Sequence, residues 1–185
     1  MASSYKTVIP TFRGIASSAI SFLTAAKEEQ SKNDKLPSGE EMLNSQMGDM
    51  LPFRMQPIIL AKFQLGPMMN SKPSATSPSL DPAALKSFDD VINFFKQLLA
   101  VIDAVDEKAW NENAQNGLDV EIGPKTLHMT AIDDFAHSFV IPNSYFHLNA
   151  MYMLLRMKGF ALGKITYVGP FMSEQMRKDW APLRS

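Results

Sequence analysis

The sequence predicts an all-α protein, a four-helix bundle with a short β-hairpin between the third and fourth helices. Four segments carry apolar residues at helical spacing. The composition, 45% hydrophobic and 20% charged, is ordinary for a globular protein, and 185 residues are enough to bury one core. We therefore expect one bundle over residues 1–169, followed by a tail over residues 170–185 with room for one short helix.

The first two helices are predicted from apolar spacing and from helix-start signals. Apolar residues recur on one helical face over about residues 11–28. The second helical region opens with Ser38 and Glu41, which are spaced as a capping box. It continues through RMQPIILAKFQL, where Pro57 should bend the helix because proline removes one backbone hydrogen bond. The following NSKPSATSPSLDPAALK, rich in serine and proline, predicts a surface loop.

The third and fourth helices flank the predicted hairpin. Ser87 starts the third helix, which has the strongest apolar face of the chain: Phe88, Val91, Ile92, Phe95, Leu98, Leu99, Ile102 and Val105. The segment LDVEIGPKTLHM alternates around a Gly-Pro turn, so we expect a hairpin that lies against the helices. Thr130 and Asp133 are predicted to cap the fourth helix, which should end near Gly159.

Charge and composition argue against several classes of function. The net charge is −1 with both signs interspersed, so we expect neither nucleic acid nor a membrane surface as a partner. No apolar run approaches the roughly 20 residues of a membrane span. The chain has no cysteine, which fits a reducing compartment, and we expect a cytoplasmic protein. The stretch GIASSAISFLTAA imitates a signal segment, but its helical spacing favours the first bundle helix.

Polar residues on apolar helix faces form the candidate site. Asn143 and His147 are four residues apart, about 40° round the helix axis, and Met151 extends the same face. Gln56 is a polar residue on the apolar face of the second helix. If the two faces meet, His147 and Asn143 would be the catalytic pair, with His147 as acid or base. Alternatively, His147 donates to a backbone carbonyl and Gln56 satisfies carbonyls freed by Pro57.

Other side chains are candidates for the walls of a substrate pocket. We assign substrate binding to Gln56, Tyr145, His137 and Met151. Tyr145 could present its hydroxyl at a pocket edge, although most such tyrosines are packing residues. His137 lies about 80° off the line of His147 unless the helix bends at Pro142. The 13 methionines fit an adaptable apolar pocket, or equally a methionine-filled core.

The segment YFHLNAMYMLLRMKG resembles a part of DinB-like proteins in which a Tyr-His pair is followed by LLR and then Gly. His147, Leu154-Leu155-Arg156 and Gly159 keep that spacing. Together with YKTVIPTFRGIASSAISFLTAAK and GDMLPFRMQ, the chain is similar to a DinB-like branch known as the domain of unknown function family nineteen ninety-three. The similarity extends from about Tyr5 to Gly169.

This resemblance implies a DinB-like four-helix bundle that forms a homodimer. It also implies a divalent-metal site built from one histidine of the second helix and an HxxxH pair on the last. Only His147 of that set is present, because Asn143 replaces the first histidine of the pair and the second helix offers Gln56 or Arg54. Amides are poor substitutes for imidazole with zinc or nickel. We therefore expect no cofactor, with a divalent metal as the less favoured alternative.

The functional expectation is a pocket near His147 that binds a small apolar organic molecule. Conversion of that molecule by isomerisation, cyclisation, dehydration or hydrolysis would fit the same residues. The first alternative is a non-catalytic ligand-binding or structural dimeric bundle. The second is a divalent-metal hydrolase or transferase that uses His147 with another imidazole, His137 or His128.

Overall fold

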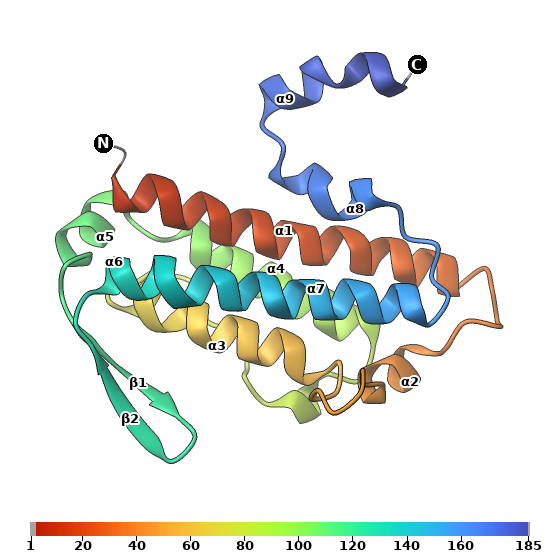
Figure 1. Ribbon diagram of the computed structural model, residues 1–185, viewed down its shortest axis with the longest axis horizontal. Helices are drawn as coiled ribbons and strands as arrows, with labels where there is room; N and C mark the ends of the chain where they lie inside the picture. The colour runs from red at the N-terminus through yellow and green to blue at the C-terminus, as the bar shows by residue number, and fades with distance from the viewer. Residues whose placement is uncertain (1–2, 185) are drawn as a thin grey trace.

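The computed structural model describes residues 3–184 and confirms the helical bundle with its short hairpin (Figure 1). Its four long helices are α1 (Ser4–Gln30), α3 (Met55–Met69), α4 (Phe88–Asp103) and α7 (Ile141–Met157). Helix α1 packs against α4, and α3 packs against α7. Two short helices, α2 (Gly39–Asn44) and α5 (Glu107–Asn113), close the ends of the bundle.

The direction of the helices explains the long serine- and proline-rich loop. Helices α1 and α7 run one way along the bundle, whereas α3 and α4 run the other way (Figure 1). Because α3 and α4 are parallel, residues 70–87 must carry the chain back along the bundle before α4 can begin. Loops of that length are uncommon in compact domains. This one contains a single 3-10 turn, η1 (Pro82–Ala84).

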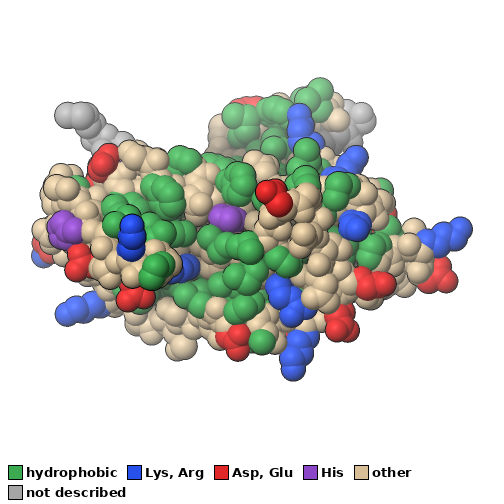
Figure 2. Space-filling model, turned by 60° about the horizontal axis from the view of Figure 1, so that its bottom comes forward, with side chains coloured by type: hydrophobic (Ala, Val, Ile, Leu, Met, Phe, Trp, Pro, Cys, Tyr) green, Lys and Arg blue, Asp and Glu red, His purple; other side chains and the backbone are tan. Residues whose placement is uncertain are grey.

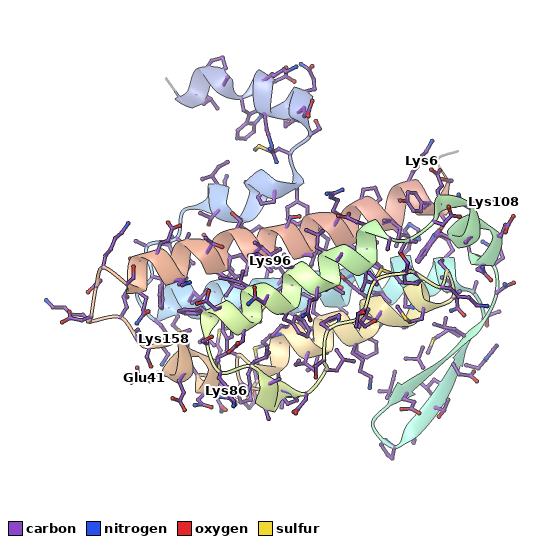
Figure 3. All side chains as sticks on the ribbon, turned by 180° about the vertical axis from the view of Figure 1, so that it is seen from behind. Lys6, Glu41, Lys86, Lys96, Lys108 and Lys158 are labelled. Carbon is purple, nitrogen blue, oxygen red and sulfur yellow. The ribbon has the colours of Figure 1, made fainter. Side chains whose placement is uncertain are left out.

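The core lies where the apolar faces of the four long helices meet. Phe12, Phe22, Phe95 and Leu98 have no exposed surface. Within residues 3–184, α1 is the one helix that is long and apolar enough to cross a membrane, and 56% of its apolar window is buried in the bundle. A core helix gives that pattern, because its apolar face is covered by neighbouring helices. Charged side chains such as Lys6, Lys96 and Lys108 lie on the outer surface (Figure 3).

Helix starts follow the capping signals in two predicted places. Ser38 and Glu41 form a complete capping box at α2, and the Ser87 hydroxyl accepts a hydrogen bond from the backbone N–H of Asp90 at α4. The prediction of a bend at Pro57 was wrong. Helix α3 begins at Met55, so Pro57 lies in its first turn, where backbone N–H groups have no partner within the helix.

The hairpin consists of β1 (Leu118–Ile122) and β2 (Lys125–Met129), joined by a turn in which Gly123 has a φ of +58°. A positive φ is easily adopted only by glycine. The strands project away from the helices (Figure 1), and only Leu118 and Val120 of the two strands are buried. The expectation that the whole hairpin lies against the helices was therefore wrong; only its base does.

The fourth helix begins differently from the prediction. Its first turn, α6 (Ile132–Phe135), starts after Ala131 without a side-chain cap, so the prediction that Thr130 and Asp133 cap this helix was wrong. A π-helical turn, η2 (Ala136–Val140), then leads into α7. Pro142 lacks the N–H that would bond to the carbonyl of Ser138, which explains a change of hydrogen-bond register at this point.

The chain after α7 contains short helical elements besides the one short helix predicted for the tail, residues 170–185. Helix α8 (Lys164–Val168) and the 3-10 turn η3 (Gly169–Phe171) pack on α1. Helix α9 (Glu174–Asp179) is the predicted short helix, and a last 3-10 turn, η4 (Ala181–Arg184), follows it. These last two elements extend away from the bundle (Figure 1). The C-terminal segment therefore divides into a docked part and a projecting part.

Replacement of Ser87 by alanine should lower the free energy of unfolding by about 1 kcal/mol, because α4 loses its N-terminal cap. The same change should raise the pKa of Asp90, which the hydrogen bond from the Ser87 side chain lowers. Chemical denaturation measures the first effect. Ser74→Ala is the matched control, since Ser74 is exposed in the preceding loop and makes no hydrogen bond within the described chain. Equal stability of the two variants would contradict the prediction.

Candidate functional site at the interface of helices α3 and α7

Gln56 and His147 meet across the interface of α3 and α7. The Nδ1 atom of His147 lies 2.8 Å from the Oε1 atom of Gln56. Only 3% of Gln56 and 8% of His147 is exposed, so this hydrogen bond is shielded from water. The apolar faces of the two helices therefore do meet, and they bring Gln56 and His147 together. The roles assigned to them in binding or catalysis stay predictions.

The orientation of the Gln56 amide determines which ring nitrogen of His147 carries the hydrogen. The Nε2 atom of Gln56 donates to the backbone carbonyl of Leu51 at 2.6 Å, and this carbonyl can only accept. The Oε1 atom must then face His147, so the Nδ1 atom of the imidazole carries a hydrogen and donates it. The Nε2 atom of His147 keeps its lone pair and makes no hydrogen bond within residues 3–184.

The electrostatic state of His147 follows from its surroundings. Burial disfavours the imidazolium ion and lowers the pKa of His147 from 6.5 to about 4. The ring is therefore neutral near pH 7, with one hydrogen on Nδ1 and a lone pair on Nε2. A neutral imidazole in this tautomer can accept a hydrogen bond or act as a weak base, but it cannot attract an anion by charge.

A second polar contact joins the same two helices, and sequence reasoning missed it. Gln64 is fully buried on α3, and its Nε2 atom donates to the hydroxyl of Ser144 at 3.1 Å. Gln64 lies eight residues after Gln56, about 80° round the helix axis, so this spacing does not place it on the face of Gln56. The signal that could have found it is a second glutamine within the apolar run of α3. Two buried atoms at this interface have no hydrogen-bond partner in the described chain, Oε1 of Gln64 and Nδ2 of Asn143.

Asn143, Met151 and Tyr145, the remaining predicted site residues of α7, make no hydrogen bond to His147 in the described chain. Asn143 is half-buried and makes no hydrogen bond to His147. Met151 has no exposed surface and belongs to the core. Tyr145 packs against Phe171, with ring centroids 5.9 Å apart, and burial raises its pKa.

His137 lies on the π-helical turn and is exposed. Its Nε2 atom lies 3.0 Å from the hydroxyl of Thr7, and its Nδ1 atom lies 2.9 Å from the carbonyl of Asp133. The two ring nitrogens therefore contact groups of α6 and α1. His128 lies on β2, where its Nδ1 atom is 2.7 Å from a carboxylate oxygen of Asp119. Neither histidine is hydrogen-bonded to His147 or Gln56.

An open apolar groove adjoins the Gln56–His147 pair. Its volume is about 230 Å³, and its walls come from the segment before α3 and from α7: Met47, Met50, Phe146, Asn149, Ala150 and Met153. A much smaller hollow of about 10 Å³ shares three of these residues and reaches Gln56. We call the larger hollow the methionine groove. Neither hollow has His147 or Asn143 among its lining residues.

Exposed apolar side chains surround the methionine groove. On α7, Phe146, Met153 and Met157 are each more than half exposed, and Leu51 is similarly exposed on the segment before α3. Figure 2 shows a face of the molecule on which hydrophobic side chains gather in the middle and charged side chains lie mostly around them. A contiguous apolar surface on a globular protein commonly marks a place where a ligand or another protein binds.

A family model describes most of the chain. The model of the domain of unknown function DUF1993 matches residues 4–168. The chain belongs to the DUF1993 family. No curated protein sequence matches it.

A solved structure supports the DinB-like fold of this DUF1993 chain. The fold is similar to the crystal structure of a DinB family member protein from Shewanella denitrificans, with a TM-score of 0.67. The two chains are 23% identical, and the similarity covers 89% of this chain and 91% of the other. At this level of identity the likeness establishes the fold and nothing about activity.

The metal site that the DinB resemblance implies does not fit the residues of this DUF1993 chain. His147 uses Nδ1 as a hydrogen-bond donor to Gln56, so only its Nε2 atom could bind a metal. Asn143 and Gln56 supply amides, which bind zinc or nickel poorly. Within residues 3–184, no group of three or more His, Cys, Asp or Glu side chains is placed to hold a metal ion.

Replacement of Gln56 by leucine should lower the free energy of unfolding by about 1–3 kcal/mol, because the carbonyl of Leu51 and the Nδ1–H of His147 lose their partner. Gln97→Leu on α4 is the matched control, since Gln97 is exposed and makes no hydrogen bond in the described chain. Urea denaturation of both variants tests the prediction. A similar small change in both would show that the Gln56 bridge contributes little.

The stability of the protein should fall as the pH drops below about 6.5, because unfolded His147 binds a proton that the folded state, with its pKa of about 4, does not. The effect is absent above the unfolded pKa and complete below the folded one. Urea denaturation at about pH 7.5 and about pH 5 measures it. His147→Gln should show a weaker pH dependence over this range than wild type. An unchanged dependence would mean that another group is responsible.

Proposed function

We propose that this protein binds a small apolar organic molecule in the methionine groove. The observation that supports the proposal best is the groove itself, an open hollow of about 230 Å³ with methionine and phenylalanine walls. Methionine side chains adapt to irregular apolar ligands because they are unbranched and polarisable. Asn149 is the one polar residue among the groove's lining residues, and its amide could orient a ligand through a hydrogen bond.

Binding is better supported than chemical conversion. A catalytic acid or base must reach the atom on which it acts, at a hydrogen-bond distance or through one water. His147 and Asn143 are absent from the lining of the groove, and Gln56 reaches only the smaller hollow beside it. Gln56 and His147 serve the proposed site indirectly, because their hydrogen bond holds the start of α3 against α7.

A second candidate function is a non-catalytic dimeric bundle in which another copy of the chain covers this face. The observation in its favour is the exposed apolar stripe of Phe146, Met153 and Met157, which extends beyond the groove along α7. The stripe offers an apolar surface to a flat partner as well as to a small ligand. Met153 lines the groove and Met157 does not, so the two residues distinguish the candidates.

The experiment compares Met153→Glu with Met157→Glu. Both side chains are about equally exposed, at 55% and 57%, so the two variants change the surface charge equally. The probe is N-phenyl-1-naphthylamine, an uncharged apolar fluorophore. We expect saturable binding to wild type, about tenfold weaker binding to Met153→Glu because a carboxylate cannot be desolvated cheaply, and unchanged binding to Met157→Glu.

Analytical ultracentrifugation of the same three proteins tests the second candidate. If both glutamate variants convert a wild-type dimer into a monomer, the stripe is an interface between copies. If the probe does not bind to wild type in a saturable way, or binds equally well to Met153→Glu, the proposal of a small-molecule groove is wrong.

A further inference from the structure

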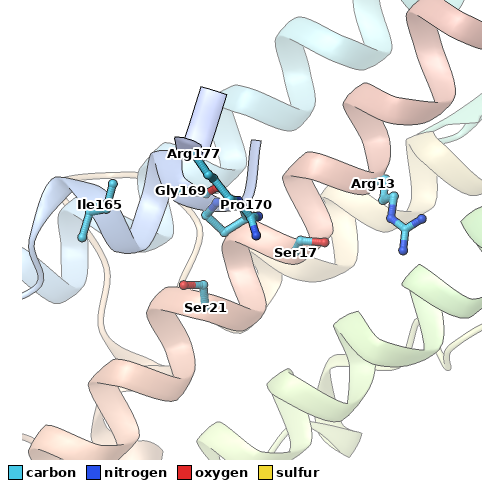
Figure 4. Close-up of a pocket in the computed structure, with 7 residues that line it drawn as sticks. All are labelled: Arg13, Ser17, Ser21, Ile165, Gly169, Pro170 and Arg177. Carbon is cyan, nitrogen blue, oxygen red and sulfur yellow. The ribbon is translucent and has the colours of Figure 1, made fainter. Parts of the chain in front are cut away.

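Another hollow, separate from the methionine groove, lies between α1 and the C-terminal segment. Its volume is about 510 Å³, and the residues that line it include Arg13, Ser17 and Ser21 of α1 with Pro170 and Arg177 of the C-terminal segment (Figure 4). Among the described residues that line it, the two charged ones are both arginines. We call it the arginine cavity. It shares no lining residue with the methionine groove.

The α1 side of the arginine cavity presents a row of hydrogen-bond donors. Arg13, Ser17 and Ser21 are spaced four residues apart, so they follow one another along the same side of the helix. Figure 4 shows the Ser17 hydroxyl directed toward Arg13. The hydroxyls of Ser17 and Ser21 make no hydrogen bond within residues 3–184.

The hydroxyls of Thr7, Thr11 and Ser18, also on α1, donate hydrogen bonds within the protein. Those of Thr7 and Thr11 donate to backbone carbonyls of the preceding turn, at 3.0 and 2.9 Å. The buried Ser18 hydroxyl donates to the carbonyl of Tyr167 at 2.8 Å. Ser17 and Ser21 are therefore the hydroxyls of α1 that lie at a hollow and remain available to a ligand.

The opposite wall contributes the second guanidinium. Arg177 comes from α9 and reaches back over Pro170 toward α1 (Figure 4). One of its nitrogens lies 3.4 Å from the carbonyl of Gly169, which leaves most of its N–H donors free. Arg13 forms an ion pair with Asp103 at 3.2 Å, and water weakens that pair because the two side chains are 59% and 43% exposed.

The wall formed by the C-terminal segment is held in place by close packing. A Cβ atom at position 14 would lie 2.4 Å from the ring of Phe171, so glycine is required there for the ring to seat on α1. The ring of Tyr167 stacks on Phe22 at 6.4 Å, and the Ser18–Tyr167 hydrogen bond fixes the same segment. The packed part of this wall is therefore α8 and η3, whereas Arg177 reaches the hollow from α9, which projects from the bundle.

We infer that the arginine cavity binds an oxyanion, the phosphate or carboxylate group of a small organic molecule. Guanidinium groups match the planar geometry of two oxygens, and serine hydroxyls complete the hydrogen bonding of such a group. The cavity is larger than a bare phosphate requires, and Ile165 and Pro170 provide an apolar wall for an organic part. The inference does not depend on the methionine groove, because the two sites have no lining residue in common.

The test measures binding of two probes, inorganic phosphate and succinate, by the shifts of backbone amide signals in NMR spectra at low ionic strength. We expect saturable binding of at least one probe to wild type, with the largest shifts at Ser17 and Ser21. The probe that binds more tightly identifies the headgroup as a phosphate or a carboxylate. Failure of both probes to bind would overturn the inference.

A matched pair of variants on α9 locates the site. Arg177→Gln should weaken binding by about fivefold or more, because a charge-assisted contact to the anion is lost. Lys178→Gln removes the same charge from the next position, which does not line the cavity, and should change binding less than about twofold. Equal weakening by the two variants would overturn the inference, since it would mean that net charge alone attracts the probe.

Discussion

The hydrogen bond between Gln56 and His147 determines how α3 meets α7. The Gln56 amide makes two hydrogen bonds: its nitrogen donates to the carbonyl of Leu51, and its oxygen accepts from His147. The segment that carries Met47 and Met50 leads directly into that amide, so the outer wall of the methionine groove is anchored by it. Loss of either hydrogen bond would leave a buried polar group without a partner, which costs free energy. The pair therefore favours this one packing of α3 against α7 over others.

The other half of the molecule depends on small residues of α1. Gly14 lets the ring of Phe171 approach the helix, and Ser18 then fixes the backbone at Tyr167. One face of α1 therefore packs in the bundle core, and an adjacent face packs against the C-terminal segment. Ser17 and Ser21 lie at the edge of that contact, where their hydroxyls have no partner in the described chain. A 27-residue helix can serve both surfaces because residues on different sides of it contact different elements.

The bundle could be predicted from the sequence because its evidence is periodic and local. The apolar face of α4 and the caps at Ser38 and Ser87 can be recognised in the sequence of each helix alone, without knowledge of the elements that pack against it. The position of the hairpin could not be predicted, since the alternation of apolar and polar residues indicates strands but not which elements they pack against. In the site, convergence of Gln56 with His147 followed from helix faces. That Arg13 and Arg177 line the same hollow could not be predicted, because it depends on how the C-terminal segment lies over α1.

The two hollows proposed as binding sites differ in the charge of the residues that line them. At the methionine groove, burial keeps His147 neutral near pH 7, so nothing in that interface draws an anion out of water. At the arginine cavity the lining charges are exclusively positive among the described residues, and the hydroxyls beside them are unpaired. An apolar molecule gains most from the first hollow, where it covers exposed methionine and phenylalanine. An oxyanion gains most from the second, where it replaces water with guanidinium and hydroxyl donors. The two proposed sites have no lining residue in common, so a substitution in one hollow leaves the lining of the other unchanged.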